Sequence, residues 1–196
     1  MKKVIGVLAL QGDYFEHAQA ILACGADSRL VKTPEGLEGL DGLIIPGGES
    51  TTMCILAQKE GLIKPLQSFV RSGKTVWGTC AGMILLADHV EGQMQDGQAT
   101  IGGLNITVSR NFFGRQTQSF EASLSIPEVS RLPIDVFFIR APGVTKVGPD
   151  VQVLASYSFQ GKDVPVALRQ GNILATAFHP ELTADTSFHR YFLSFT

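Results

Sequence analysis

The chain has 196 residues, 44% of them hydrophobic and 17% charged, so it can bury a substantial core and is expected to form one domain over residues 1–196. A formal net charge of −2 without a long basic cluster excludes a general nucleic-acid surface, because phosphate binding needs concentrated lysine and arginine. The first apolar run, 4–10, is too short for a membrane span or a signal peptide. These features indicate a soluble globular protein with a small-molecule or protein partner.

The cysteine content points to a reducing compartment. Cys24, Cys54 and Cys80 are widely spaced and form no CxxC pair. This odd set favours reduced thiols in a cytoplasm over a disulfide framework or a zinc site, so no metal site is expected.

The first half of the chain alternates between apolar runs of strand length and segments of helical periodicity. Strands are expected over 4–10, 27–32, 42–45 and 75–77, and helices over 14–24, 51–59 and 63–72. Near-continuous apolar runs are typical of strands covered on both faces of a parallel sheet. The pattern predicts an α/β fold with a doubly wound, mostly parallel central sheet and flanking helices.

The second half contains shorter runs in which apolar and polar residues alternate. These runs predict strands over 104–108, 120–124, 136–139, 151–155 and 164–168. We expect them to form an antiparallel or mixed extension of the sheet. A last apolar strand over 173–178 and a helix over 186–193 complete the predicted elements.

Cys80 lies where a buried strand meets a buried helix, expected over 83–87. The spacing G-x-C-x-G matches a nucleophile elbow with cysteine in place of serine, in which Gly78 and Gly82 allow the strand and helix to approach closely. Unpaired N–H groups at the helix start favour the thiolate. Cys80 is therefore a candidate nucleophile. The alternative is a small buried cysteine beside packing glycines.

His179 and Glu181 follow the last predicted strand and could supply the base that a cysteine nucleophile needs, with its orienting carboxylate. Residues i and i+2 of an extended chain project to the same side, so the two side chains are expected to lie close together. The strand before Cys80 ends at the same edge of a doubly wound sheet. The alternative is a capping histidine beside a solvated glutamate.

A glycine-rich turn follows the strand 42–45 at this edge. The backbone N–H groups of Gly47 and Gly48 can turn toward an oxyanion or a phosphate, and Ser50 or Thr51 can cap the helix behind. No GxxxxGK[ST] or GxGxxG motif supports the phosphate hypothesis. A plain tight turn is the alternative.

Two arginines are candidates for binding a substrate carboxylate, because a guanidinium matches a carboxylate with two parallel hydrogen bonds. They are Arg110 and Arg140, for which surface arginine is the alternative. We expect structural or surface roles for His17, His89, His189, Cys24 and Cys54. The three histidines lie on predicted helices or at their ends.

Three motifs in this order, over 46–51, 78–82 and 178–181, together resemble the triad (class I) glutamine amidotransferases. Within that superfamily the chain resembles the glutaminase subunits of pyridoxal 5'-phosphate synthases over almost its whole length. The segments that carry this closer resemblance are 8–12, 46–52, 110–116, 138–142 and 178–183.

The resemblance implies Cys80 as nucleophile, His179 as general base and acid, and Glu181 as its orienting carboxylate. The residues implied to contact glutamine are Gly48, Glu49, Ser50, Arg110, Ile139 and Arg140. The amides implied to stabilise the oxyanion come from Gly47, Gly48 and Ala81.

The resemblance also implies a partner. Ammonia released from L-glutamine would pass to a (β/α)8-barrel synthase subunit in a large ring-shaped hetero-oligomer, which would combine it with a pentose phosphate and a triose phosphate to make the vitamin B6 cofactor. The glutaminase itself would need no cofactor, and would be poorly active until the partner orders the oxyanion loop.

The chain departs from the expected family pattern in three places. Asp13-Tyr14 is bulkier than the small residues expected there, Trp77 replaces a phenylalanine, and the segment after the last helix is short. The first departure could alter contacts with a partner, and none is expected to touch the triad.

Three other functions remain open from the sequence. The chain could be a glutaminase serving another synthase, such as one for histidine or purines. It could be a non-catalytic docking subunit with an inert Cys80, against which the intact Cys80, His179 and Glu181 argue. It could also be a cysteine peptidase acting on peptides or γ-glutamyl bonds, which Arg110 and Arg140 make less favoured.

Overall fold

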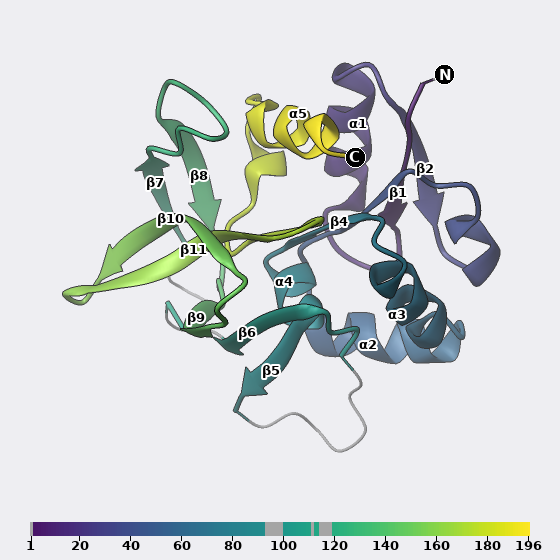
Figure 1. Ribbon diagram of the computed structural model, residues 1–196, viewed down its shortest axis with the longest axis horizontal. Coiled ribbons are helices and arrows are strands. Elements are labelled where there is room, and N and C mark those ends of the chain that lie inside the picture. The colour runs from purple at the N-terminus through teal and green to yellow at the C-terminus, as the bar shows by residue number, and fades with distance from the viewer. Residues whose placement is uncertain (1, 93–99, 111, 114–118) are drawn as a thin grey trace.

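The computed structural model describes residues 2–92, 100–110, 112–113 and 119–196 (Figure 1). Part of the segment 110–116 that carries the family resemblance lies outside the described residues, namely Asn111, Gly114, Arg115 and Gln116.

A central sheet of seven strands has the order β10-β11-β12-β4-β3-β1-β2. Its strands are β1 (Val4–Leu8), β2 (Asp27–Val31), β3 (Gly42–Ile45), β4 (Thr75–Thr79), β10 (Gln152–Phe159), β11 (Lys162–Gln170) and β12 (Ile173–Thr176). β1, β2, β3, β4 and β12 pair in parallel, whereas β10 and β11 are antiparallel. The predicted doubly wound, mostly parallel sheet is confirmed.

The helices form one layer on each side of this sheet (Figure 1). α1 (Tyr14–Ala23) and α5 (Ser187–Ser194) lie on one face, and α2 (Ser50–Lys59), α3 (Ile63–Arg71) and α4 (Ala81–Leu86) lie on the other. A short 3₁₀ helix, η1 (Pro34–Leu37), follows β2. The loops after the neighbouring strands β1 and β3 therefore lead to helices on opposite faces of the sheet. Doubly wound sheets bind ligands between two such loops, at the carboxyl ends of the strands.

Two smaller sheets form the expected extension in the second half. One contains β5 (Ala87–Glu91), β6 (Leu104–Ser109) and β9 (Gly143–Val147), and the other pairs β7 (Phe120–Leu124) with β8 (Ile134–Phe138). β5 and β9 were not predicted from the sequence. β5 lacks an apolar alternation, and it places His89 in a strand rather than in or at the end of a helix.

The element boundaries differ from the predicted ones mainly where tertiary contacts decide them. The β10 and β11 strands form one long hairpin, extended beyond the apolar runs, whose turn contains Gln160 and Gly161 with φ of 50° and 76°. The helix after Cys80 begins at Ala81 and ends at Leu86. Within the described residues, no helix is both long and apolar enough to span a bilayer.

Candidate active site

Cys80 occupies the sharp turn between β4 and α4 with φ 47° and ψ −102°, a conformation that is strained for a residue with a side chain. A Cβ on Gly78 would lie 2.6 Å from the carbonyl carbon of Gly82. A Cβ on Gly82 would run into the carbonyl oxygen of Ile45 at the end of β3. The two glycines therefore allow the close packing that the sequence predicted around the elbow.

Backbone pairing brings His179 to the same edge of the sheet as Cys80. β12 and β4 are in register up to Thr176 and Thr79, and the Cys80 N–H donates to the Thr176 carbonyl at 2.8 Å. The His179 N–H then donates to the carbonyl of Phe137 at 2.8 Å, which fixes the chain as it leaves β12.

The predicted proximity of His179 and Glu181 is confirmed, but its cause differs from the expectation. His179 Nδ1 lies 2.8 Å from Glu181 Oε1, and both side chains are buried. Glu181 belongs to a short 3₁₀ helix, η2 (Pro180–Leu182). A tight turn, not the alternation of an extended strand, therefore brings the carboxylate under the imidazole.

A second carboxylate reaches the same imidazole nitrogen. Asp13 Oδ2 lies 3.2 Å from His179 Nδ1, so the expectation that no departure from the family pattern touches the triad is wrong. The reason is topological: the loop after β1 lies beside the loop after β3, and both border the turn after β12. Asp13 was missed because nothing in the local sequence around it indicates this long-range contact.

The protonation of His179 is set by these neighbours. Burial works to lower the pKa of His179, but hydrogen bonds with Asp13, Cys80 and Glu181, together with the charge of Cys80, raise it to about 12. Burial raises the pKa of Glu181, and its hydrogen bond with His179 opposes that shift. His179 is accordingly an imidazolium that can donate a proton from the nitrogen facing away from the two carboxylates.

A cleft of about 770 Å³ opens over Cys80 and His179. The predicted site residues that line it are Gly48, Glu49, Ser50, Cys80, Ala81, Arg110, Ile139, Arg140 and His179. The lining residues that the sequence analysis did not propose as site residues are Gln11, Asp13, Ile84 and Leu182. Gly47 is not among the lining residues of this cleft, and a Cβ on it would run into the imidazole of His179.

The Gly47–Gly48 turn is held by the loop that follows β1. The Asp13 N–H donates to the Gly47 carbonyl at 3.2 Å, and the Glu49 N–H donates to Gln11 Oε1 at 2.7 Å. Gln11 belongs to the motif 8–12 after the first strand, which was the only signal in the sequence that could have identified it.

Glu49, and not Ser50 or Thr51, caps α2. Its carboxylate accepts hydrogen bonds from the N–H groups of Thr51 at 3.0 Å and Thr52 at 2.7 Å. Burial works to raise the pKa of Glu49, but the hydrogen bonds from Thr52 and Thr51 lower it overall. Because Glu49 remains charged, it also holds Arg110, whose Nη2 lies 3.3 Å from Glu49 Oε1 at the rim of the cleft.

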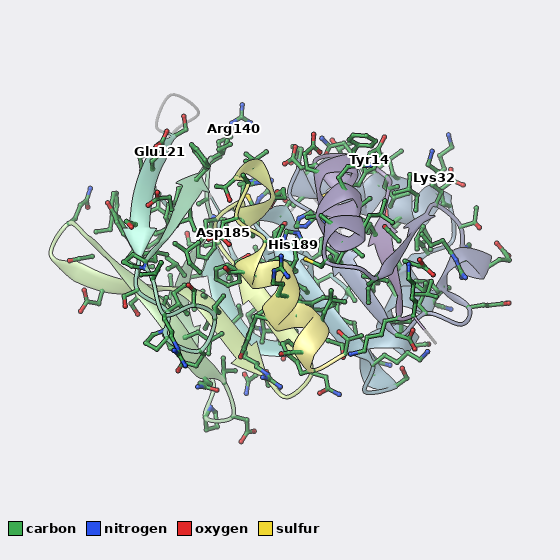
Figure 2. All side chains as sticks on the ribbon, turned by 90° about the horizontal axis from the view of Figure 1, so that it is seen from above. Tyr14, Lys32, Glu121, Arg140, Asp185 and His189 are labelled. Carbon is green, nitrogen blue, oxygen red and sulfur yellow. The ribbon has the colours of Figure 1, made fainter. Side chains whose placement is uncertain are left out.

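Ile139 and Arg140 border the cleft on the side of β8. The Cys80 sulfur lies 3.7 Å from the carbonyl oxygen of Ile139. Arg140 has φ 47° and is exposed, and Figure 2 shows it at the periphery of the molecule. Its guanidinium is therefore open to solvent and to a ligand entering the cleft.

Asp13, His179 and Glu181 are the group of described residues that could hold a metal ion, with one ligand atom each within 4.8 Å of one another. The 2.8 Å separation of His179 Nδ1 and Glu181 Oε1 is that of a hydrogen bond. Two ligands of a tetrahedral Zn²⁺ would stand about 3.4 Å apart, so a metal would have to separate them. The geometry fits a hydrogen-bonded histidine better than a metal centre.

At the edge of a doubly wound sheet, Cys80 and His179 therefore line one cleft, and Glu181 is hydrogen-bonded to His179. The model of the SNO glutamine amidotransferase family matches residues 7–196. The chain belongs to this family.

Named relatives and a solved structure are similar to this chain over nearly its whole length. The chain is 52% identical to the pyridoxal 5'-phosphate synthase subunit PdxT of Streptomyces avermitilis, over 97% of this chain and 92% of that protein. It is 48% identical to the probable pyridoxal 5'-phosphate synthase subunit PDX2 of Arabidopsis thaliana, over 98% of this chain and 85% of that protein. A crystal structure of a glutamine amidotransferase matches with a TM-score of 0.88 and 44% identity, over 97% of both chains.

Proposed function

We propose that this chain, as one glutaminase domain, hydrolyses L-glutamine to L-glutamate and ammonia and serves as the glutaminase subunit of a pyridoxal 5'-phosphate synthase. The observation that carries the proposal is the position of Cys80 beside His179 and Glu181 at a cleft that also contains Arg110 and Arg140. Membership of the glutamine amidotransferase family and the names of the relatives support the substrate and the pathway.

Acylation begins with attack of the Cys80 sulfur on the side-chain amide carbon of glutamine. The carbonyl oxygen becomes an oxyanion, stabilised by N–H groups of the Gly47–Gly48 turn and of Ala81. His179 donates its proton to the leaving nitrogen, the C–N bond breaks, and ammonia departs from a γ-glutamyl thioester on Cys80. Glu181 keeps the imidazole oriented throughout.

Deacylation uses the same groups in reverse. His179, now neutral, takes a proton from a water molecule as the water oxygen attacks the thioester carbon. The C–S bond breaks, glutamate leaves, and the Cys80 thiolate and the His179 imidazolium are restored.

The substrate's charges match the rim of the cleft. The guanidinium groups of Arg110 and Arg140 can pair with the α-carboxylate of glutamine. Gly48, Glu49, Ser50 and Ile139 supply the remaining proposed contacts. Glu49 caps α2 and holds Arg110, so its carboxylate positions the carboxylate-binding group.

The relatives are named as synthase subunits, which supports a partner subunit that consumes the ammonia. We propose that this partner is a (β/α)8 barrel in a large ring-shaped hetero-oligomer. The cytoplasmic location remains a prediction from the sequence.

The test is glutamate release from L-glutamine by the chain alone and with the cognate synthase subunit, with Cys80→Ala as the control. Partner-stimulated release that requires Cys80 supports the whole proposal. Release that the partner does not affect would contradict the assignment to vitamin B6 synthesis and favour another synthase. No release under either condition would favour a docking subunit, and hydrolysis of γ-glutamyl peptides instead of glutamine would favour a peptidase.

A further inference from the structure

Glu181 has two carboxylate oxygens, and only one of them contacts the catalytic histidine. Oε1 lies 2.8 Å from His179 Nδ1. Oε2 is fully buried, and His17 Nε2 stands 3.3 Å from it. Among the described residues no donor, His17 included, makes a hydrogen bond of standard geometry to this oxygen. A buried carboxylate oxygen without a donor is unfavourable. His17 is therefore of interest as the group that could supply this donor.

His17 is a buried titratable residue that the proposed mechanism does not use. It lies on α1 with no exposed surface, and the ring of Trp77 packs edge-on at 5.4 Å between centroids. Burial, and then the charges of His189 and His179, lower the pKa of His17 well below its usual value. His17 is therefore neutral and carries a single ring N–H.

The neighbouring His189 decides which nitrogen of His17 carries that N–H. His189 Nε2 lies 3.0 Å from His17 Nδ1, and α5, which carries His189, lies beside α1 in both views (Figure 2). His189 Nδ1 is buried without a partner among the described residues, which an unprotonated nitrogen tolerates better than an N–H. The His189 proton thus belongs on Nε2, from which it donates to His17 Nδ1.

This arrangement puts the His17 proton on Nε2. That nitrogen faces Glu181 Oε2 at 3.3 Å and Thr79 Oγ1 at 3.2 Å. Thr79 is the residue immediately before Cys80, so the same ring contacts the elbow and the carboxylate that orients the base. Of these two acceptors, Glu181 Oε2 is the one without a hydrogen-bond partner among the described residues.

We propose that His17 is a positioning residue that donates a hydrogen bond from Nε2 to Glu181 Oε2, and that His189 sets its tautomer. With both oxygens engaged, Glu181 cannot rotate away from His179 while the imidazole loses and regains its proton. The role in turnover rests on the proposed glutaminase function, whereas the hydrogen bond itself does not.

The test compares His17→Leu, which removes the donor, with His17→Gln, whose side-chain N–H can reach the same oxygen. His89→Gln, at an exposed histidine outside the site, is the matched control. With glutamine and the synthase subunit present, we expect His17→Leu to lower kcat about tenfold or more with little change in KM, and His17→Gln to recover most of kcat. Thermal melting of each variant establishes that it is folded.

The pH profile separates positioning from a structural effect. The charged or titratable groups facing Glu181 are His179, His17 and, from the loop before α1, Asp13. Loss of the donor destabilises the charged carboxylate, so the pKa of Glu181 rises in His17→Leu. As the pH is lowered, this variant should therefore lose activity at a higher pH than the wild-type protein does. His17→Gln should restore the wild-type profile.

A readout without turnover is the proton resonance of His179 Nδ1–H, assigned by its absence in His179→Gln. It should shift in His17→Leu and return in His17→Gln. Wild-type kcat, pH profile and resonance in folded His17→Leu would overturn the proposal, as would equal loss of kcat in both variants with an unchanged resonance. If the wild-type protein releases no glutamate, the proposed function fails, and the resonance alone decides whether His17 holds Glu181.

Discussion

The carboxylate of Asp13 lies 3.2 Å from His179 Nδ1, beside the carboxylate of Glu181 at 2.8 Å from the same nitrogen. A single N–H cannot be fully shared by two acceptors. The Glu181 side chain has no exposed surface, whereas the Asp13 side chain is 36% exposed and belongs to a loop. Glu181 is therefore the fixed partner of His179, and Asp13 is a solvent-facing second charge that strengthens the imidazolium form.

Removal of the second charge should make His179 easier to deprotonate. Asp13→Asn is expected to lower the pKa of His179 from about 12 by about one unit or more, since an opposite charge at this distance favours the protonated ring. The measurement is an NMR titration of His179, with Glu16→Gln on the exposed face of α1 as the control. An unchanged titration in Asp13→Asn would show that Glu181 and Cys80 alone hold the proton.

A methyl group at Gly47 should disturb His179, the proposed general acid and base, directly. Because a Cβ there would meet the His179 imidazole, Gly47→Ala must displace either the ring or the Gly47–Gly48 turn. We expect glutaminase activity to fall about a hundredfold or more. Steady-state kinetics test this, and Gly36→Ala is the control because a Cβ at Gly36 makes only ordinary contacts at 3.4 Å or more. Near-normal kcat in Gly47→Ala would contradict the close packing.

Two substitutions at Arg140 should separate binding from backbone strain. Arg140→Ala and Arg140→Gly both remove the guanidinium and are expected to raise KM for glutamine by similar factors. Only glycine accepts the φ of 47° without strain, so Arg140→Gly should be more stable than Arg140→Ala by about 1 kcal/mol. Glutamine kinetics and urea unfolding of the pair test both parts. Equal stability would argue that this backbone conformation is not retained.

The stability of the fold should decline in mild acid through His189. Burial lowers the pKa of His189 to about 4, while the charge of Asp185 opposes the shift. Above about pH 6.5 the residue is neutral in both states, so it contributes no pH dependence there. As the pH falls toward 4 the unfolded chain binds the proton first, and stability is lost by up to about 3 kcal/mol.

The urea midpoint should therefore fall between pH 7 and pH 5, and the fall should be smaller in His189→Leu. His89→Leu, at an exposed histidine, should keep the full dependence. A fall as large in His189→Leu as in the wild-type protein would assign the effect to other groups.

Local sequence determined the elements of the first half and the elbow at Cys80. Apolar runs between glycine and proline turns define β1, β3 and β4, because burial on both faces of a parallel sheet leaves a continuous apolar signature. The two-residue spacing of His179 and Glu181 was equally readable, although a tight turn rather than a strand brings them together. These features depend on neighbours in the chain.

Only the tertiary structure decided which distant groups meet. Asp13 reaches His179, Glu49 holds Arg110, and His17 stands beside Glu181, each across a contact that no local pattern records. β5 and β9 likewise form because β6 lies between them, and their own sequences show no strong alternation. The sequence by itself therefore determined the parallel sheet, the elbow at Cys80 and the His179–Glu181 pair, which follow from short-range spacing and burial. The charges and hydrogen bonds that tune His179 depend on how loops from different strands pack together.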